Sequence, residues 1–227
     1  MSGNLGHIAP WTRRIIVLNV LVAILADWMP AWGWGEGLRQ TWPFTIEGLW
    51  RGEVWRLFTY MWMHAGLYGL LLFHLLFNMM TLYFLGRVVE PVLGGRRFLW
   101  IYFGGGLCAV VAYLIDVSLA ALLLGSPVDV EQPLVGASGA VCAVFGVFAL
   151  LAPEARLYLM LIPYPIRAVN AMRGFVWISL GLMVIGWWPE MREHPSWGWL
   201  FSVAHSAHLG GLFFGWWAMR RIMRRRI

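Results

Sequence analysis

The sequence predicts an all-α membrane protein, a single domain over residues 1–227 in which six helices cross the bilayer. Apolar residues make up 60% of the chain and charged residues 12%, whereas soluble chains have roughly 45–50% and about 25%. The apolar residues form long runs, and a helix of about 20 such residues crosses a bilayer. The arginines lie beside these runs, where they orient membrane proteins.

The six expected helices follow the apolar runs in chain order. They cover about residues 15–29, 70–92, 98–124, 136–152, 168–188 and 200–222. The first follows two arginines, as the core of a signal peptide would. However, the sequence Trp-Gly-Trp-Gly comes after it rather than a small-residue cleavage site, so we expect this run to remain as a helix.

The connections between these runs differ in arginine content. All 17 basic residues are arginines, and 13 of them lie near the two termini, in the 86–98 turn or in residues 153–173. By the positive-inside rule we expect both termini in the cytoplasm, with the bacterial plasma membrane as the location. The arginine-rich tail is then placed to rest on anionic lipid of the bilayer. Membrane orientation accounts for the net charge of +6, so no nucleic-acid partner is expected.

Two connections have compositions of their own. Residues 31–69 are rich in tryptophan, phenylalanine and glycine, and such aromatic residues favour the headgroup region. We therefore expect a structured interfacial element on the outer face. Residues 156–165 are apolar but contain Pro163 and Pro165, which indicates a partly extended connection.

Gly136-Ala-Ser-Gly-Ala140 opens the fourth run. Small residues let membrane helices approach closely. A serine at a helix N-terminus also lies beside free backbone N–H groups, which can stabilise an oxyanion. Most such strings in membrane proteins serve packing alone, so this motif by itself favours packing over catalysis.

His208 lies in the sixth run, just before Gly211 and Gly215. These glycines can seat the sixth helix against the small-residue face of the fourth, which includes Gly139. Such close contact is what a hydrogen bond from Ser138 to a histidine base requires. The alternative is a histidine that only joins two helices by a hydrogen bond.

His74 and Asn78 are four residues apart in the second run and therefore lie on one helical face. A neutral imidazole and an amide can both donate hydrogen bonds, as an oxyanion hole requires. Interhelical hydrogen bonding is an equally good explanation of this pair alone. With both termini inside, the second, fourth and sixth helices all enter from the outer face, so the four polar residues are expected at one depth.

In this combination and order, the motifs resemble those of the rhomboid family of intramembrane serine proteases. The family pattern is a Gly-x-Ser-Gly, a His followed by Gly-xxx-Gly, and a His-xxx-Asn. Further matching residues are Trp55-Arg56, Leu85-Gly86 and Glu90. The resemblance covers about residues 50–220.

The resemblance implies a role for each site residue. Ser138 would be the nucleophile and His208 the general base, with His74, Asn78 and the Ser138 amide around the oxyanion. The substrates would be transmembrane segments of other proteins, and no metal or cofactor is implied. Two features depart from the family: Cys142 stands where many relatives have an aromatic residue against the histidine, and His205 is an additional histidine.

Other classes of function account for some of the same residues. A rhomboid-like protein without catalysis could bind and escort membrane proteins. A membrane electron carrier could hold haem with two of the histidines His64, His74, His205 and His208. A zinc protease of the His-Glu-xx-His type is disfavoured because that motif is missing. Cys108 and Cys142 lie in apolar runs and indicate neither a disulfide framework nor a CxxC metal site. The substrate and the oligomeric state do not follow from the sequence.

Overall fold

The architecture comes from a computed structural model, which describes residues 9–28, 34–64, 70–158, 164–196 and 204–224. Six helices make up most of this part of the chain. They are α1 (Pro10–Trp28), α5 (Leu70–Leu93), α6 (Gly95–Leu124), α7 (Ser138–Leu151), α8 (Ala168–Ile185) and α11 (His205–Arg224). Each coincides with one of the six apolar runs. Where the sixth run was expected to begin, at residue 200, the chain lies outside the described residues.

Three helical stretches of the described chain are long and apolar enough to cross a bilayer. They are Leu72–Leu93, Gly95–Leu124 and Ala168–Ile185, and α7 is apolar but shorter. By length and composition these helices fit an integral membrane protein. Large apolar side chains, such as Phe73 and Leu76 on α5 and Trp177 on α8, remain exposed along them, as lipid-facing side chains do.

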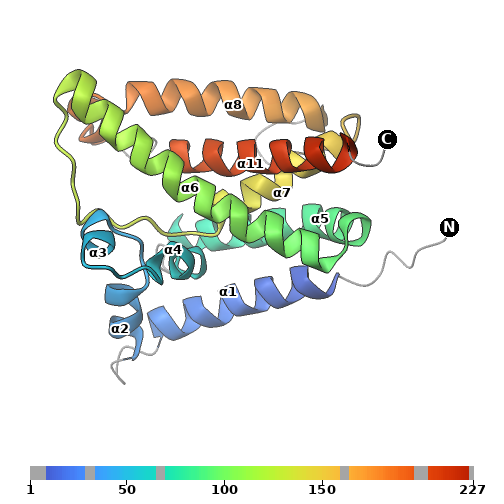
Figure 1. Ribbon diagram of the computed structural model, residues 1–227, viewed down its shortest axis with the longest axis horizontal. Coiled ribbons are helices and arrows are strands. Elements are labelled where there is room, and N and C mark those ends of the chain that lie inside the picture. The colour runs from blue at the N-terminus through green and yellow to red at the C-terminus, as the bar shows by residue number, and fades with distance from the viewer. Residues whose placement is uncertain (1–8, 29–33, 65–69, 159–163, 197–203, 225–227) are drawn as a thin grey trace.

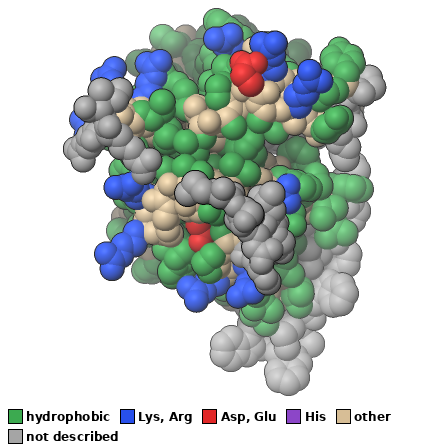
Figure 2. Space-filling view, turned by 90° about the vertical axis from the view of Figure 1, so that its right-hand side faces the viewer, with side chains coloured by type: hydrophobic (Ala, Val, Ile, Leu, Met, Phe, Trp, Pro, Cys, Tyr) green, Lys and Arg blue, Asp and Glu red, His purple; other side chains and the backbone are tan. Residues whose placement is uncertain are grey.

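The helices run roughly lengthwise through the molecule, with the short helices between α1 and α5 at one end (Figure 1). The start of α1 and the end of α11 lie together at the opposite end. That end carries exposed arginines around an apolar surface (Figure 2). They include Arg14, Arg87, Arg97 and Arg220, and three of these side chains lie over aromatic rings.

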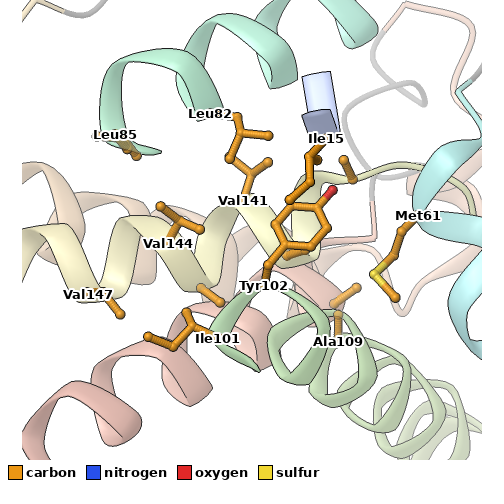
Figure 3. Packing of buried hydrophobic residues seen from close by; sticks show 14 of the residues in the cluster. Ile15, Met61, Leu82, Leu85, Ile101, Tyr102, Ala109, Val141, Val144 and Val147 are labelled. Atoms are coloured by element: carbon orange, nitrogen blue, oxygen red, sulfur yellow. The ribbon is translucent and has the colours of Figure 1, made fainter. Parts of the chain in front are cut away.

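Helix α7 is the centre of the bundle and packs against α5, α6 and α11. Along α7, Val141 lies beside Leu82 and Val147 lies near Ile101, and all of these side chains belong to one buried cluster (Figure 3). Lipid is as apolar as these side chains, so their close packing, rather than exclusion of water, stabilises such contacts. The packing therefore holds rigid the helix that carries Ser138.

Helix α1 is joined to the end of α5 by a buried carboxylate. Glu90 is 3% exposed. It accepts hydrogen bonds from the backbone N–H of Trp11 at 3.0 Å, from that of Thr12 at 2.8 Å and from the Thr12 hydroxyl at 2.8 Å. A carboxylate is stabilised at a helix N-terminus, where backbone N–H groups lack partners within the helix. Glu90 therefore fixes where α1 meets α5.

Residues 34–64, between α1 and α5, are folded. They form α2 (Trp34–Thr41), α3 (Ile46–Trp50), α4 (Arg56–Thr59) and the 3-10 turn η2 (Tyr60–Trp62). Arg56 is 8% exposed. Its guanidinium donates to the Glu53 carboxylate, to the Pro43 carbonyl at 2.7 Å and to the Gln40 carbonyl at 2.9 Å. The arginine of the Trp55-Arg56 pair thus holds this segment together.

The segment before α8 contains a short two-stranded sheet, which is the one sheet among the described residues. Strand β1 (Arg156–Leu157) pairs antiparallel with β2 (Ile166–Arg167). This agrees with the partly extended connection expected over residues 156–165, of which 159–163 lie outside the described residues. A further short helix, α9 (Pro189–Arg192), follows α8.

Candidate active site

Ser138 is the first residue of α7 and follows a turn that depends on glycine. Gly136 has φ +118°, a conformation that side-chain-bearing residues rarely adopt. Its N–H donates to the carbonyl of Tyr60 at 3.0 Å. Gly136 was expected among the helix-packing residues, but it lies in the loop before α7, where its function is to make this turn.

The hydroxyl of Ser138 lies 2.8 Å from Nε2 of His208, although 70 residues separate them in the chain. His208 sits in the first turn of α11, where its backbone N–H donates to the Ala204 carbonyl. This is the distance expected between a nucleophilic hydroxyl and its general base. The structure therefore brings together the two residues on which the predicted chemistry depends.

Close approach of α7 and α11 makes this hydrogen bond possible. A Cβ on Gly211 would lie 1.9 Å from the carbonyl oxygen of Gly139, and one on Gly215 would lie 1.9 Å from that of Ala143. Only glycine fits at either position, because ordinary contacts begin near 3.4 Å. Gly139, Gly211 and Gly215 thus occupy the helix interface that the sequence predicts.

His74 of α5 borders the space beside Ser138. A Cβ built on Gly136 would lie 3.1 Å from Nε2 of His74 and 3.6 Å from the Ser138 hydroxyl. The imidazole and the hydroxyl therefore line the same small space. Because Gly136 carries no side chain, this space stays open between them.

Asn78 lies one turn further along α5 and is buried. Its amide Nδ2 donates to the carbonyl oxygen of His74, within the same helix, at 2.9 Å. An amide nitrogen carries two hydrogens, so one of them remains for another acceptor.

The first turn of α7 adds backbone donors to the same space. The N–H of Val141 bonds to the carbonyl of Ala137, so the N–H groups of Ser138, Gly139 and Ala140 precede the first bond of the helix. Such N–H groups carry the positive end of the helix dipole and favour an anion. Together with His74, they can stabilise an oxyanion formed next to Ser138.

Comparison with known proteins places this arrangement in a family. The family model described as the Rhomboid domain matches residues 51–225. The chain belongs to the rhomboid family. The match begins before Trp55-Arg56 and ends after α11, so it includes every residue of the candidate site.

Named rhomboid relatives come from several organisms. The zebrafish (Danio rerio) protein "Presenilin-associated rhomboid-like protein A, mitochondrial" is 29% identical over 146 residues, which cover 63% of this chain and 32% of the relative. "Rhomboid protein 1, mitochondrial" of Saccharomyces cerevisiae is 28% identical over 157 residues, 67% of this chain and 40% of the relative. The rhomboid-family protein YdcA of Bacillus subtilis is 35% identical over 104 residues, covering 46% of this chain and 44% of YdcA.

Two conclusions follow from these relatives. The chain spans only about a third of the length of the zebrafish relative, so the activity of the whole relative does not transfer to it directly. Two of the three are named as mitochondrial, so similarity does not single out a bacterial location.

In this rhomboid an aromatic residue from a different helix packs against His208. Phe175 of α8 has its ring centroid 6.1 Å from that of His208. Cys142, which stands where many rhomboids have an aromatic residue, lies on α7 and is a free thiol. The sequence contains no signal that links Phe175 to His208, because the contact joins two helices. The ring of His205 is also near His208, with its centroid 6.3 Å away.

Sequence reasoning also missed Tyr60, which supports the turn before Ser138. Its carbonyl accepts from Gly136, and its hydroxyl donates to the Gly106 carbonyl on α6 at 2.7 Å. Burial, with Tyr102 nearby, raises the pKa of Tyr60, so the phenol keeps its proton and remains a donor. The folded 34–64 segment is thus part of the support of the site.

No group of three metal-binding side chains lies close together within the described ranges.

Proposed function

We propose that this rhomboid is an intramembrane serine endopeptidase in which Ser138 is the nucleophile and His208 the general base. The observation that carries the proposal is the 2.8 Å distance between the Ser138 hydroxyl and Nε2 of His208. This hydrogen bond joins α7 to α11, and the two helices come this close only because Gly211 and Gly215 have no side chains. A histidine that served packing alone would not need to face a serine at the N-terminus of a helix.

Peptide cleavage would proceed in two stages. Nε2 of His208 accepts the Ser138 proton as the hydroxyl oxygen attacks the carbonyl carbon of the substrate peptide. The negative charge that develops on the carbonyl oxygen is stabilised by the N–H groups at the start of α7, His74 and Asn78. His208 then passes its proton to the departing amine, leaving an ester on Ser138. Water, deprotonated by His208, hydrolyses this ester and restores the serine.

The proposed substrates are transmembrane segments of other proteins. The position of α8 supports this substrate class. Helix α8 packs mainly on α11 and α7, which carry the serine and the histidine. Only 11% of its membrane-length window is buried, so most of this helix is left open to a transmembrane segment that approaches from the lipid. A peptide bond within a helix is shielded by the helical hydrogen bonds. Segments with helix-breaking residues near the cleaved bond are therefore the proposed class. No cofactor is needed for this chemistry.

The proposed membrane arrangement is a single rhomboid domain over residues 1–227 with six spans, corresponding to α1, α5, α6, α7, α8 and α11. The exposed arginines at the end shared by the start of α1 and the end of α11 support cytoplasmic termini (Figure 2). Residues 34–64 would then lie at the outer interface. We place the protein in a bacterial plasma membrane, with a mitochondrial membrane as the competing location.

A fluorophosphonate probe tests the proposal, because it reacts covalently with an activated serine. The wild type, Ser138→Ala and His208→Ala would be purified in detergent, labelled, and then incubated with a tagged single-span substrate. Labelling and cleavage by the wild type alone are expected. A folded wild type that neither labels nor cleaves would contradict the proposal, and a rhomboid that only binds membrane proteins would be the better explanation.

A further inference from the structure

A second histidine lies against His74, in the chain segment that supports the site. His64 follows η2 and is 7% exposed. Its ring centroid is 5.3 Å from that of His74, and the ring planes are inclined at 62°. His64 therefore lies against the imidazole that borders Ser138, although it belongs to a different part of the chain.

The surroundings hold His64 in place. Tyr60, four residues earlier, bonds to Gly136 and to Gly106 of α6. Met63 is buried and packs in a cluster with Val22 and Ala26 of α1. The segment that ends at His64 is thus fixed to α1, to α6 and to the turn before Ser138.

Both ring nitrogens of His64 are buried, and neither makes a well-formed hydrogen bond among the described residues, although the backbone of Trp62 lies near enough to act on the ring. Burying a polar group without a partner is costly, and buried polar groups are nearly always bonded to protein or to ordered water. Packing alone would be served better by an apolar ring. A histidine at this position therefore indicates a polar function next to His74.

His74 has a requirement that His64 can meet. To donate a hydrogen bond to an oxyanion beside Ser138, His74 must carry its proton on Nε2, the nitrogen that borders Gly136. The tautomer of a neutral histidine is set by the partner of its other nitrogen. Nδ1 of His74 must then accept a hydrogen bond from a donor behind the ring.

We infer that His64 is a positioning residue for His74, and that it acts through a buried water shared by the two rings. One ring nitrogen of His64 binds this water, and the water donates to Nδ1 of His74. This chain of hydrogen bonds keeps the proton of His74 on Nε2, directed at the oxyanion. The catalytic part of the inference rests on the proposed protease function, whereas the tautomer of His74 does not.

A double-mutant cycle tests whether His64 acts through His74. Removal of one oxyanion donor costs about 100- to 1,000-fold in kcat, and we expect His74→Ala in that range. His64→Phe keeps the buried ring but removes both nitrogens, and it should lower kcat by about 10- to 100-fold, within that limit, while KM changes little. Added to His74→Ala, it should cause no further loss. His64→Gln, which can donate and accept, should retain more activity than His64→Phe.

Met63→Ala is the matched control. It removes a neighbouring buried side chain that packs on α1, so its effect should multiply with that of His74→Ala. If His64→Phe also multiplies with His74→Ala, or if it leaves kcat unchanged, His64 does not position His74.

Nitrogen-15 NMR of histidine-labelled protein tests the inference without any substrate. The His74 signals, assigned with His74→Ala, should show the Nε2–H tautomer in the wild type and a mixture of tautomers in His64→Phe. The same tautomer in both proteins would overturn the inference. A wild type that shows no Ser138-dependent labelling would instead contradict the protease function. The tautomer measurement would still decide the role of His64.

Discussion

Replacing Gly211 with alanine would force α7 and α11 apart. The added Cβ would lie 1.9 Å from the carbonyl oxygen of Gly139, whereas ordinary contact begins at 3.4 Å. Relief of the overlap therefore requires a displacement of about 1.5 Å. Gly211 is one helical turn from His208, so the imidazole should move with the backbone.

The magnitude follows from the hydrogen bond at the site. Moved by that amount away from Ser138, Nε2 of His208 would lie well beyond the roughly 3.2 Å limit of a good hydrogen bond, compared with 2.8 Å now. General-base catalysis contributes about 10²- to 10⁴-fold, so fluorophosphonate labelling should slow at least about 100-fold. Overpacking should also lower the free energy of unfolding by about 1–3 kcal/mol.

The assay compares labelling rates and thermal unfolding of the wild type, Gly211→Ala and Gly181→Ala. Gly181 lies in α8, where an added Cβ meets nothing within 4 Å. Its replacement should leave labelling unchanged and stabilise the helix by up to about 1 kcal/mol. A Gly211→Ala protein that labels at the wild-type rate would refute the reasoning that this glycine contact sets the distance between serine and histidine.

Three further predictions concern the support of the site. Glu90→Gln weakens the bonds to Thr12 and should cost about 1–3 kcal/mol in the free energy of unfolding, which chemical denaturation measures; an unchanged midpoint would contradict it. Burial, reinforced by the neighbouring histidine, lowers the pKa of His64 to about 3, against about 6.5 when unfolded. Stability should therefore be complete above about pH 6.5 and decline as the pH falls, and His64→Phe should show a smaller decline in thermal melts. Phe175→Ala removes a ring contact worth about 0.5–1.5 kcal/mol and should slow labelling about two- to tenfold, whereas Trp177→Ala, 74% exposed, should not.

The helices could be predicted because their signal is local. An apolar run of membrane length predicts a helix whatever surrounds it, and the six runs match α1, α5, α6, α7, α8 and α11 within a few residues at most ends. The sequence predicts that the first helix begins after Arg13 and Arg14, at residue 15, which is too late. The helix begins at Pro10, where Glu90 of α5 bonds to its first turn, and this bond depends on tertiary structure.

The motifs predicted part of the candidate site for a similar reason. A serine at a helix start and a histidine before two glycines can be read along the chain, and the structure places Ser138 and His208 within hydrogen-bond distance. The sequence predicted packing for Gly136, but its φ of +118° shows a turn residue. Backbone conformation of this kind depends on what the loop contacts, in this case Tyr60.

The sequence by itself thus determined that the chain is helical and suited to a membrane, roughly where its helices lie, and which polar side chains lie within the apolar runs. Only the tertiary structure decided what those side chains meet. Phe175 lies against His208, and His64 lies against His74, because separate helices and a folded loop bring them together. Hydropathy is a property of each segment, whereas a contact between segments depends on the crossing of helices and on the small residues that allow it.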